Sequence, residues 1–100
     1  MGLCLLLDKV QIGIESEYKA ICWLLGQGYT VARNVAHTGI FDLVAYKEGK
    51  TLLIDVKTLQ FNAEGPFFGW KSYLSEEQIA AGIRPLFVYG ETVGWNRDYF

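Results

Sequence analysis

Leu52-Leu53-Ile54-Asp55-Val56-Lys57 is the stretch that decides the fold, because it sets two charged side chains inside an apolar, strand-forming run. Successive side chains of a strand point to opposite faces, so Asp55 and Lys57 share a face, about 7 Å apart along the strand. Upstream, Phe41-Asp42 places another acid in a second apolar run, 40–46. Charged groups inside apolar strands need compensation for their lost hydration. A divalent cation between the acids would supply it, and such a cation also promotes phosphodiester hydrolysis.

The composition indicates a globular chain. Its 100 residues are expected to form a single domain, 1–100, with a modest core. Hydrophobic residues make up 51% and aromatic residues 15%, which excludes a disordered chain. The formal net charge of −2 argues against nucleic-acid binding unless a metal cancels acidic charge where a phosphate approaches. A local basic patch could still form from Arg33, Lys47, Lys50, Lys71 and Arg84.

The two cysteines and the apolar start indicate an intracellular protein. Cys4 and Cys22 have no metal-ligand spacing and are weak grounds for a disulfide, so we interpret Cys22 as a small buried residue of a helix in a reducing, cytoplasmic compartment. The apolar run 1–7 lacks a basic region before it, and Asp8-Lys9 follows at once. We expect it to pack within the chain or in a dimer contact. No run is long enough to span a bilayer, so no membrane partner is expected.

The hydrophobic pattern predicts an α/β fold. Apolar residues at helical spacing over 14–27 predict a helix that Gly28 ends. Ser75, with Gln78 three places on, forms a capping-box signature that opens a second helix ending near Gly82. The expected strands are 29–33, 40–46, 51–58, 85–89 and 93–99, with a turn at 48–50 and no clear period over 59–73. This order predicts a mixed central β-sheet with flanking helices.

Glu17 falls inside the apolar arc of the first predicted helix when the helix is drawn at 100° per residue. It is therefore expected to face the sheet that carries Asp42 and Asp55. Glu15 favours the helix start electrostatically, and is the alternative ligand if the helix is rotated. The opposite side of the helix is expected to hold Ser16, Lys19 and Trp23.

Three carboxylates and one lysine sharing a small volume have the chemistry of a Mg²⁺ site, in which Mn²⁺ is expected to substitute. The metal would polarise a phosphodiester and lower the pKa of a water molecule, and Lys57 would stabilise developing negative charge. The simpler interpretation of Asp55 and Lys57 is an edge strand with a solvated charged face. The placement of Glu17 and Asp42 makes that interpretation less favourable.

Glu17…Phe41-Asp42…Asp55-Val56-Lys57 resembles the E…(P)D…(D/E)XK signature of the PD-(D/E)XK nucleases, which share a restriction-endonuclease-like fold. The wider match is closest to the archaeal-type Holliday-junction resolvases. Phe41 replaces the signature proline, and Asp55 stands where those resolvases mostly carry Glu. The resemblance implies a magnesium-dependent, homodimeric endonuclease that cuts branched DNA.

The resemblance also implies roles for individual residues. The implied metal ligands are Glu17, Asp42, Asp55 and the backbone carbonyl of Val56, and the three acids together with Lys57 are the implied catalytic residues. Arg33 is expected to contact phosphate. His37 and Lys71 are further candidates for DNA contact, although a lone loop histidine is more often simply an exposed polar residue. The aromatic residues of 59–73 would complete the core or a dimer interface, or stack on unpaired bases.

Two alternatives stay open at this point. One is a site-specific homing or restriction-type endonuclease, since small phage- and intron-encoded nucleases reuse the same core. The other is a nuclease-like fold that binds DNA or a protein without cutting. The negative net charge favours this second alternative, whereas retention of all four signature residues argues against it.

Overall fold

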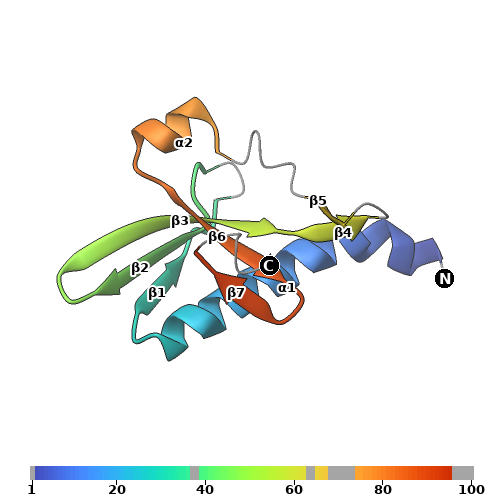
Figure 1. The fold of residues 1–100 in the computed structure, drawn as a ribbon, viewed down its shortest axis with the longest axis horizontal. Coiled ribbons are helices and arrows are strands. Elements are labelled where there is room, and N and C mark those ends of the chain that lie inside the picture. The colour runs from blue at the N-terminus through green and yellow to red at the C-terminus, as the bar shows by residue number, and fades with distance from the viewer. Residues whose placement is uncertain (1, 37–38, 63–64, 68–73, 96–100) are drawn as a thin grey trace.

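The computed structural model describes residues 2–36, 39–62, 65–67 and 74–95. A five-stranded sheet with the order β1-β2-β3-β6-β7 forms its centre, and the long helix α1 packs along it (Figure 1). The helices are α1 (Gly2–Gly26) and α2 (Glu76–Ala80). The strands of the sheet are β1 (Thr30–Arg33), β2 (Leu43–Lys47), β3 (Lys50–Thr58), β6 (Arg84–Tyr89) and β7 (Thr92–Gly94). The predicted α/β fold with a mixed central sheet and flanking helices is confirmed.

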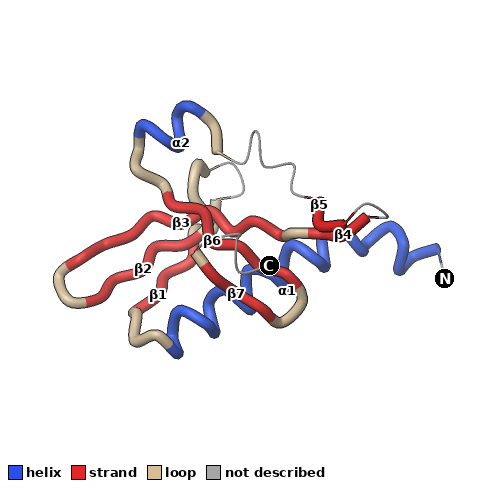
Figure 2. Tube along the Cα trace, viewed as in Figure 1, coloured by secondary structure: helices blue, strands red, loops and turns tan. Residues whose placement is uncertain are grey.

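The sheet is mixed because its strands meet in both senses. The pairs β1–β2, β2–β3 and β6–β7 are antiparallel, whereas β3 and β6 are parallel, as the arrows in Figure 1 indicate. Figure 2 shows the same strands in red and the helices in blue. The β2–β3 hairpin turns at Glu48-Gly49, with φ values of 52° and 82°, because a two-residue hairpin turn of this hand needs both residues in the left-handed region. The crossover from β3 to β6 includes a separate antiparallel ribbon, β4 (Gln60–Asn62) and β5 (Gly65–Phe67), which the sequence pattern does not predict.

The core lies between α1 and one face of the sheet. Its fully buried members are Ala20, Leu24, Leu43, Ala45, Ile54, Leu86 and Val88. Ser16 is only 5% exposed and accepts a hydrogen bond of 2.7 Å from the Thr58 hydroxyl of β3. The prediction that Ser16 lies on the outer side of the helix was therefore wrong.

The buried face of α1 is rotated from the one that the hydropathy pattern predicts, and it includes two small side chains. Ser16 and Ala20 pack inward, while Ile14, Tyr18 and Leu25 are exposed. Cys22 is also exposed with a free thiol, which corrects its interpretation as a buried residue. The helix begins at Gly2, well before the expected start at residue 14. Within the described ranges, no helix combines the length and the apolar character needed to cross a bilayer.

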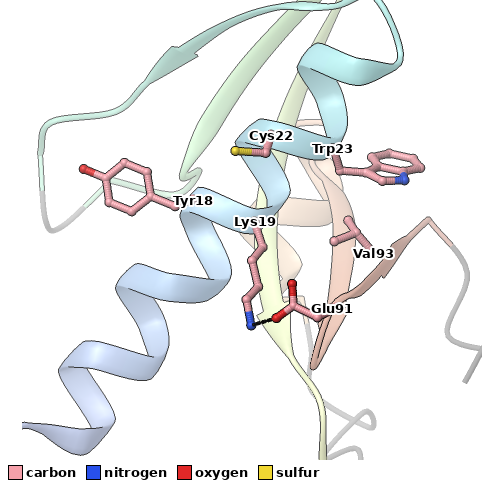
Figure 3. Close-up of a pocket in the computed structure, with 6 residues that line it drawn as sticks. All are labelled: Tyr18, Lys19, Cys22, Trp23, Glu91 and Val93. Carbon is pink, nitrogen blue, oxygen red and sulfur yellow. Dashed lines mark ion pairs between the residues drawn. The ribbon is translucent and has the colours of Figure 1, made fainter.

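The outer side of α1 is tied to the far edge of the sheet. Lys19 forms an ion pair of 2.9 Å with Glu91 and donates a hydrogen bond of 3.0 Å to the carbonyl of Gly90, in the turn between β6 and β7 (Figure 3). Trp23 makes an edge contact with Trp95 beside β7, with ring centroids 5.8 Å apart. The predicted outer side of the helix therefore makes tertiary contacts of its own.

Candidate active site

Asp55 and Lys57 lie on the face of β3 opposite the core. Ile54 belongs to the core under α1 and Val56 packs against it, so the alternate residues Asp55 and Lys57 project the other way. The Lys57 ammonium lies 2.8 Å from Asp55 Oδ2 in an ion pair. This oxygen is buried and has no partner with hydrogen-bond geometry in the described part of the chain. Lys57 therefore balances the charge of this buried oxygen.

Asp42 stands directly before β2 and reaches across to β3. The backbone N–H of Val56 donates a hydrogen bond of 2.7 Å to Asp42 Oδ2, so the strand itself fixes this carboxylate. The pKa of Asp42 is raised to about 6, mainly by burial and further by the negative charges of Asp55 and Glu17. The hydrogen bond from the Val56 N–H acts in the opposite direction and lowers it. Two acids on neighbouring strands thus share one partly desolvated volume.

Glu17 reaches this region from α1. Its side chain is 21% exposed, and Arg33 Nε, at the end of β1, donates to Glu17 Oε1 at 2.5 Å. The Arg33 guanidinium also lies over the ring of Tyr18, 5.7 Å from its centroid. Glu15 is exposed and accepts a hydrogen bond from Gln11 (3.2 Å) one turn earlier. Glu17 is therefore the helix acid that the fold directs to the sheet acids.

The structure brings the predicted site residues together to different degrees. Asp42, Asp55 and Lys57 are in one group, and Glu17 is close enough to influence Asp42 electrostatically while its carboxylate pairs with Arg33. Across 2–36, 39–62, 65–67 and 74–95, no three acidic, histidine or cysteine side chains form a ready-made metal cluster. His37 and Lys71 lie outside the described residues, as do Phe68, Trp70 and Tyr73 of the aromatic segment.

A polar cavity of about 330 Å³ adjoins the acids. Glu17, Arg33 and Asp42 line it together with residues 34–36 and Gly39. Asn34 shapes this wall, because its side-chain amide donates to the Phe41 carbonyl (2.9 Å) and its oxygen accepts from the Ala36 N–H (3.0 Å).

Gly39 is required by the same packing. A Cβ at this position would lie 2.1 Å from Asn34 Nδ2, so a larger residue would displace the Asn34 side chain. Asn34 was not among the predicted site residues, although an asparagine beside a glycine-containing loop is a recognisable signal for such a turn.

Most described members of the suggested basic patch lie away from the acids. Lys47 and Lys50 face each other at the turn end of the β2–β3 hairpin, whereas Asp42 lies at its other end. Lys47 donates to the Gln27 carbonyl (2.6 Å), and Arg84 lies over the ring of Trp95, 4.4 Å from its centroid. Among the described members of the suggested basic patch, Arg33 alone reaches the acidic site.

A second hollow, of about 440 Å³, lies between α1 and β7 (Figure 3). Tyr18, Cys22 and Trp23 contribute to its wall, and the Lys19–Glu91 ion pair closes one side. None of the predicted metal or catalytic residues lines it.

Residues 7–78 match the family model described as PD-(D/E)XK endonuclease. The chain belongs to this family. Its resemblance to the PD-(D/E)XK nucleases, drawn from the signature residues, is thereby confirmed. No curated protein matches the sequence.

One similar solved structure is that of a bacterial homing endonuclease, I-Ssp6803I, with 17% sequence identity and a TM-score of 0.57. The likeness covers 79% of this chain and 60% of that chain, so this chain spans less than two thirds of the homing endonuclease. At this identity the likeness shows that the two share a fold.

PD-(D/E)XK nucleases generally use divalent metals, and the acids of this chain fit such an ion. The donors available are carboxylate oxygens, which hard divalent cations prefer. Asp55 Oδ2 is buried without a hydrogen bond, and the pKa of Asp42 is raised by burial, with the negative charges of Asp55 and Glu17 adding to the rise. A bound cation would give Asp55 Oδ2 a ligand partner and would stabilise the negative charge of the Asp42 carboxylate.

Proposed function

We propose that this PD-(D/E)XK endonuclease hydrolyses phosphodiester bonds of DNA with Mg²⁺ as its cofactor and Mn²⁺ as a substitute. The observation that carries the proposal is the partly buried pair Asp42 and Asp55, held directly before β2 and on β3 beside Lys57. A pair of partly desolvated acids is unfavourable for the fold by itself, so its presence supports a function that needs a cation there.

Asp42, Asp55 and the backbone carbonyl of Val56 would hold the metal, with Glu17 contributing from α1. When bound, a divalent ion supplies a Lewis acid that polarises the phosphodiester and favours deprotonation of water. The ion would replace Lys57 as the counter-charge of Asp55. The ammonium of Lys57 would then be able to orient the attacking water or donate hydrogen bonds to phosphate oxygen as negative charge develops.

Arg33 supplies the positive charge nearest to the acids in the described cavity wall. Its guanidinium has five donors, of which Nε is used by Glu17, and its planar fork suits phosphate oxygens. We assign to Arg33 a contact with the DNA backbone beside the scissile phosphate. Such a contact positions the strand and carries no sequence information.

The preferred DNA is proposed to be branched, as in the Holliday-junction resolvases that the signature residues resemble. A homodimer would place two active sites on the two strands to be cut. A second candidate is cleavage of a duplex at a specific sequence, which the shared fold with a homing endonuclease favours.

The experiment is a cleavage assay with Mg²⁺, Mn²⁺ or a chelator, on a four-way junction, a flap, single-stranded DNA and a plain duplex. Asp55→Ala is expected to abolish cleavage, while Glu91→Gln, which removes an acid of the distant ion pair, keeps it. Paired nicks confined to the junction support the resolvase-like target, and cleavage at one duplex sequence supports the homing-type target. Metal-independent cutting, or full activity of Asp55→Ala, would refute the proposal, and no cleavage of any DNA favours a binding module.

A further inference from the structure

The short loop 40–42, which carries Asp42, is held by hydrogen bonds from three other parts of the chain. The Ile40 carbonyl accepts from the side-chain amide of Gln78 (2.8 Å), and the Phe41 carbonyl accepts from that of Asn34 (2.9 Å). At Asp42 itself, the N–H donates to the Ile54 carbonyl (2.8 Å) and the carbonyl accepts from the Asn34 N–H (2.9 Å). The backbone position of Asp42 is therefore set in part by two side chains from outside the loop, those of Asn34 and Gln78.

Gln78 is the most distant of these partners and has a double role. Its Oε1 accepts from the Ser75 N–H (2.9 Å) and its own N–H donates to the Ser75 hydroxyl (3.1 Å), which completes the capping box of α2. A capping box is satisfied equally by Glu or Gln at this position. Only Gln also has an N–H to give to Ile40, so the amide nitrogen serves a contact that capping does not require.

Helix α2 has little else to hold it against the site. It has five residues and none of them is buried. Ile79, its one large apolar side chain, is 64% exposed. The Gln78–Ile40 hydrogen bond, only partly exposed to solvent, therefore links the N-terminal turn of α2 directly to the loop that ends at Asp42.

We propose that Gln78 is a positioning residue that fixes the Asp42 carboxylate for metal binding and catalysis, a role that rests on the nuclease function proposed above. The order of contacts is Gln78 to the Ile40 carbonyl, loop 40–42 to Asp42, and the Asp42 carboxylate to the Val56 N–H. Loss of the amide donor leaves the Ile40 carbonyl without this partner and frees the loop to move. The Val56 N–H then loses a fixed acceptor.

Three variants separate the contact with Ile40 from the cap of α2. Gln78→Glu keeps a capping residue, loses the donor and adds a charge. Gln78→Met loses both the donor and the cap without adding a charge. Ser75→Ala weakens the cap and keeps the donor. An effect shared by both Gln78 variants and absent from Ser75→Ala is therefore due to the donor alone.

Hydrogen exchange of the Val56 amide, measured by NMR without metal, reports the Asp42 carboxylate directly because that amide donates to it. Both Gln78 variants are expected to speed this exchange about tenfold, the effect of one lost hydrogen bond, and Ser75→Ala by less than about twofold. In the cleavage assay, kcat should fall about tenfold in both Gln78 variants with KM little changed, because the lost geometry acts at the reacting centre.

Unchanged exchange at Val56 in both Gln78 variants would overturn the proposal, as would an equal effect of Ser75→Ala, which would reduce the role of Gln78 to helix stability. If the wild-type protein cuts no DNA, the nuclease function fails. The exchange rates then still decide whether Gln78 positions Asp42.

Discussion

Asp42→Asn is expected to make the metal-free protein more stable at neutral pH while abolishing cleavage. The carboxylate of Asp42 is partly desolvated and close to Asp55 and Glu17, which raises its pKa to about 6. In the unfolded chain an aspartate has a pKa of about 3.9. The folded state binds this proton more tightly than the unfolded chain does. The free energy of unfolding therefore carries no cost from Asp42 below pH 4, falls as the pH rises through 6, and has fallen by the full amount above pH 7.

The size of the effect follows from the pKa. Each pKa unit corresponds to about 1.4 kcal/mol, so ionisation of Asp42 costs the fold about 3 kcal/mol at most. Allowing for solvent screening at a half-buried group leaves about 2 kcal/mol. Asparagine is neutral and keeps an oxygen that can accept from the Val56 N–H, so the substitution removes the penalty and preserves this hydrogen bond.

The measurement is urea unfolding in a chelator at pH 4, 6 and 8, followed by tryptophan fluorescence. Asp42→Asn should unfold with a free energy about 2 kcal/mol above the wild type at pH 8 and equal to it at pH 4. Glu48→Gln, which removes one acid from the exposed hairpin turn, should stay within about 0.5 kcal/mol at each pH. The reasoning would be refuted if Asp42→Asn is less stable than the wild type at pH 8, or if its free energy of unfolding rises by the same amount at pH 4. Either result would show that ionisation of Asp42 does not destabilise the fold.

Further predictions concern the core, the lysine paired with Asp55 and the arginine paired with Glu17. Leu24→Ala should lower the free energy of unfolding by about 2–5 kcal/mol because Leu24 is fully buried, whereas Leu25→Ala, at a residue 54% exposed, should lower it by less than about 1 kcal/mol. Equal losses of the two variants in urea unfolding would contradict the observed buried face of α1. Lys57→Met should lower kcat at least about 100-fold, because the ammonium acts on negative charge that develops during the reaction, and calorimetry should show that Mn²⁺ still binds. Loss of both activity and Mn²⁺ binding would instead make Lys57 a structural residue. Arg33→Met should weaken DNA binding, and fluorescence anisotropy should show that the slope of log affinity against log salt concentration falls by about one. An unchanged slope would exclude a phosphate contact of Arg33.

Much of the fold could be predicted because its signals are local. Alternation in β3, the turn at Glu48-Gly49 and the capping box at Ser75 each depend on a few neighbouring residues, and each is present in the structure. The face of α1 was harder to predict because hydropathy favours large apolar residues. The buried face instead includes the small residues Ser16 and Ala20 beside Leu24, while the larger Ile14, Tyr18 and Leu25 are exposed.

The candidate site shows the same division. The opposite placement of Ile54 and Asp55 follows from strand alternation alone. The pairing of Glu17 with Arg33 joins the first helix to the end of β1, and no pattern within either segment indicates it. The contact of Gln78 with the loop before Asp42 spans 38 positions and uses a residue whose capping role already explains its identity in the sequence.

The β2–β3 hairpin with its leading aspartate has a consequence for how this chain can change over evolutionary time. Asp42, Asp55 and Lys57 lie within sixteen consecutive positions, and the pairing of β2 with β3 brings them together. Bringing together residues so close in sequence requires closing only a short loop, which costs little chain entropy. Outside the hairpin and the residues that hold loop 40–42, the sequence can then diverge widely while the fold is retained, as the 17% identity with the homing endonuclease illustrates.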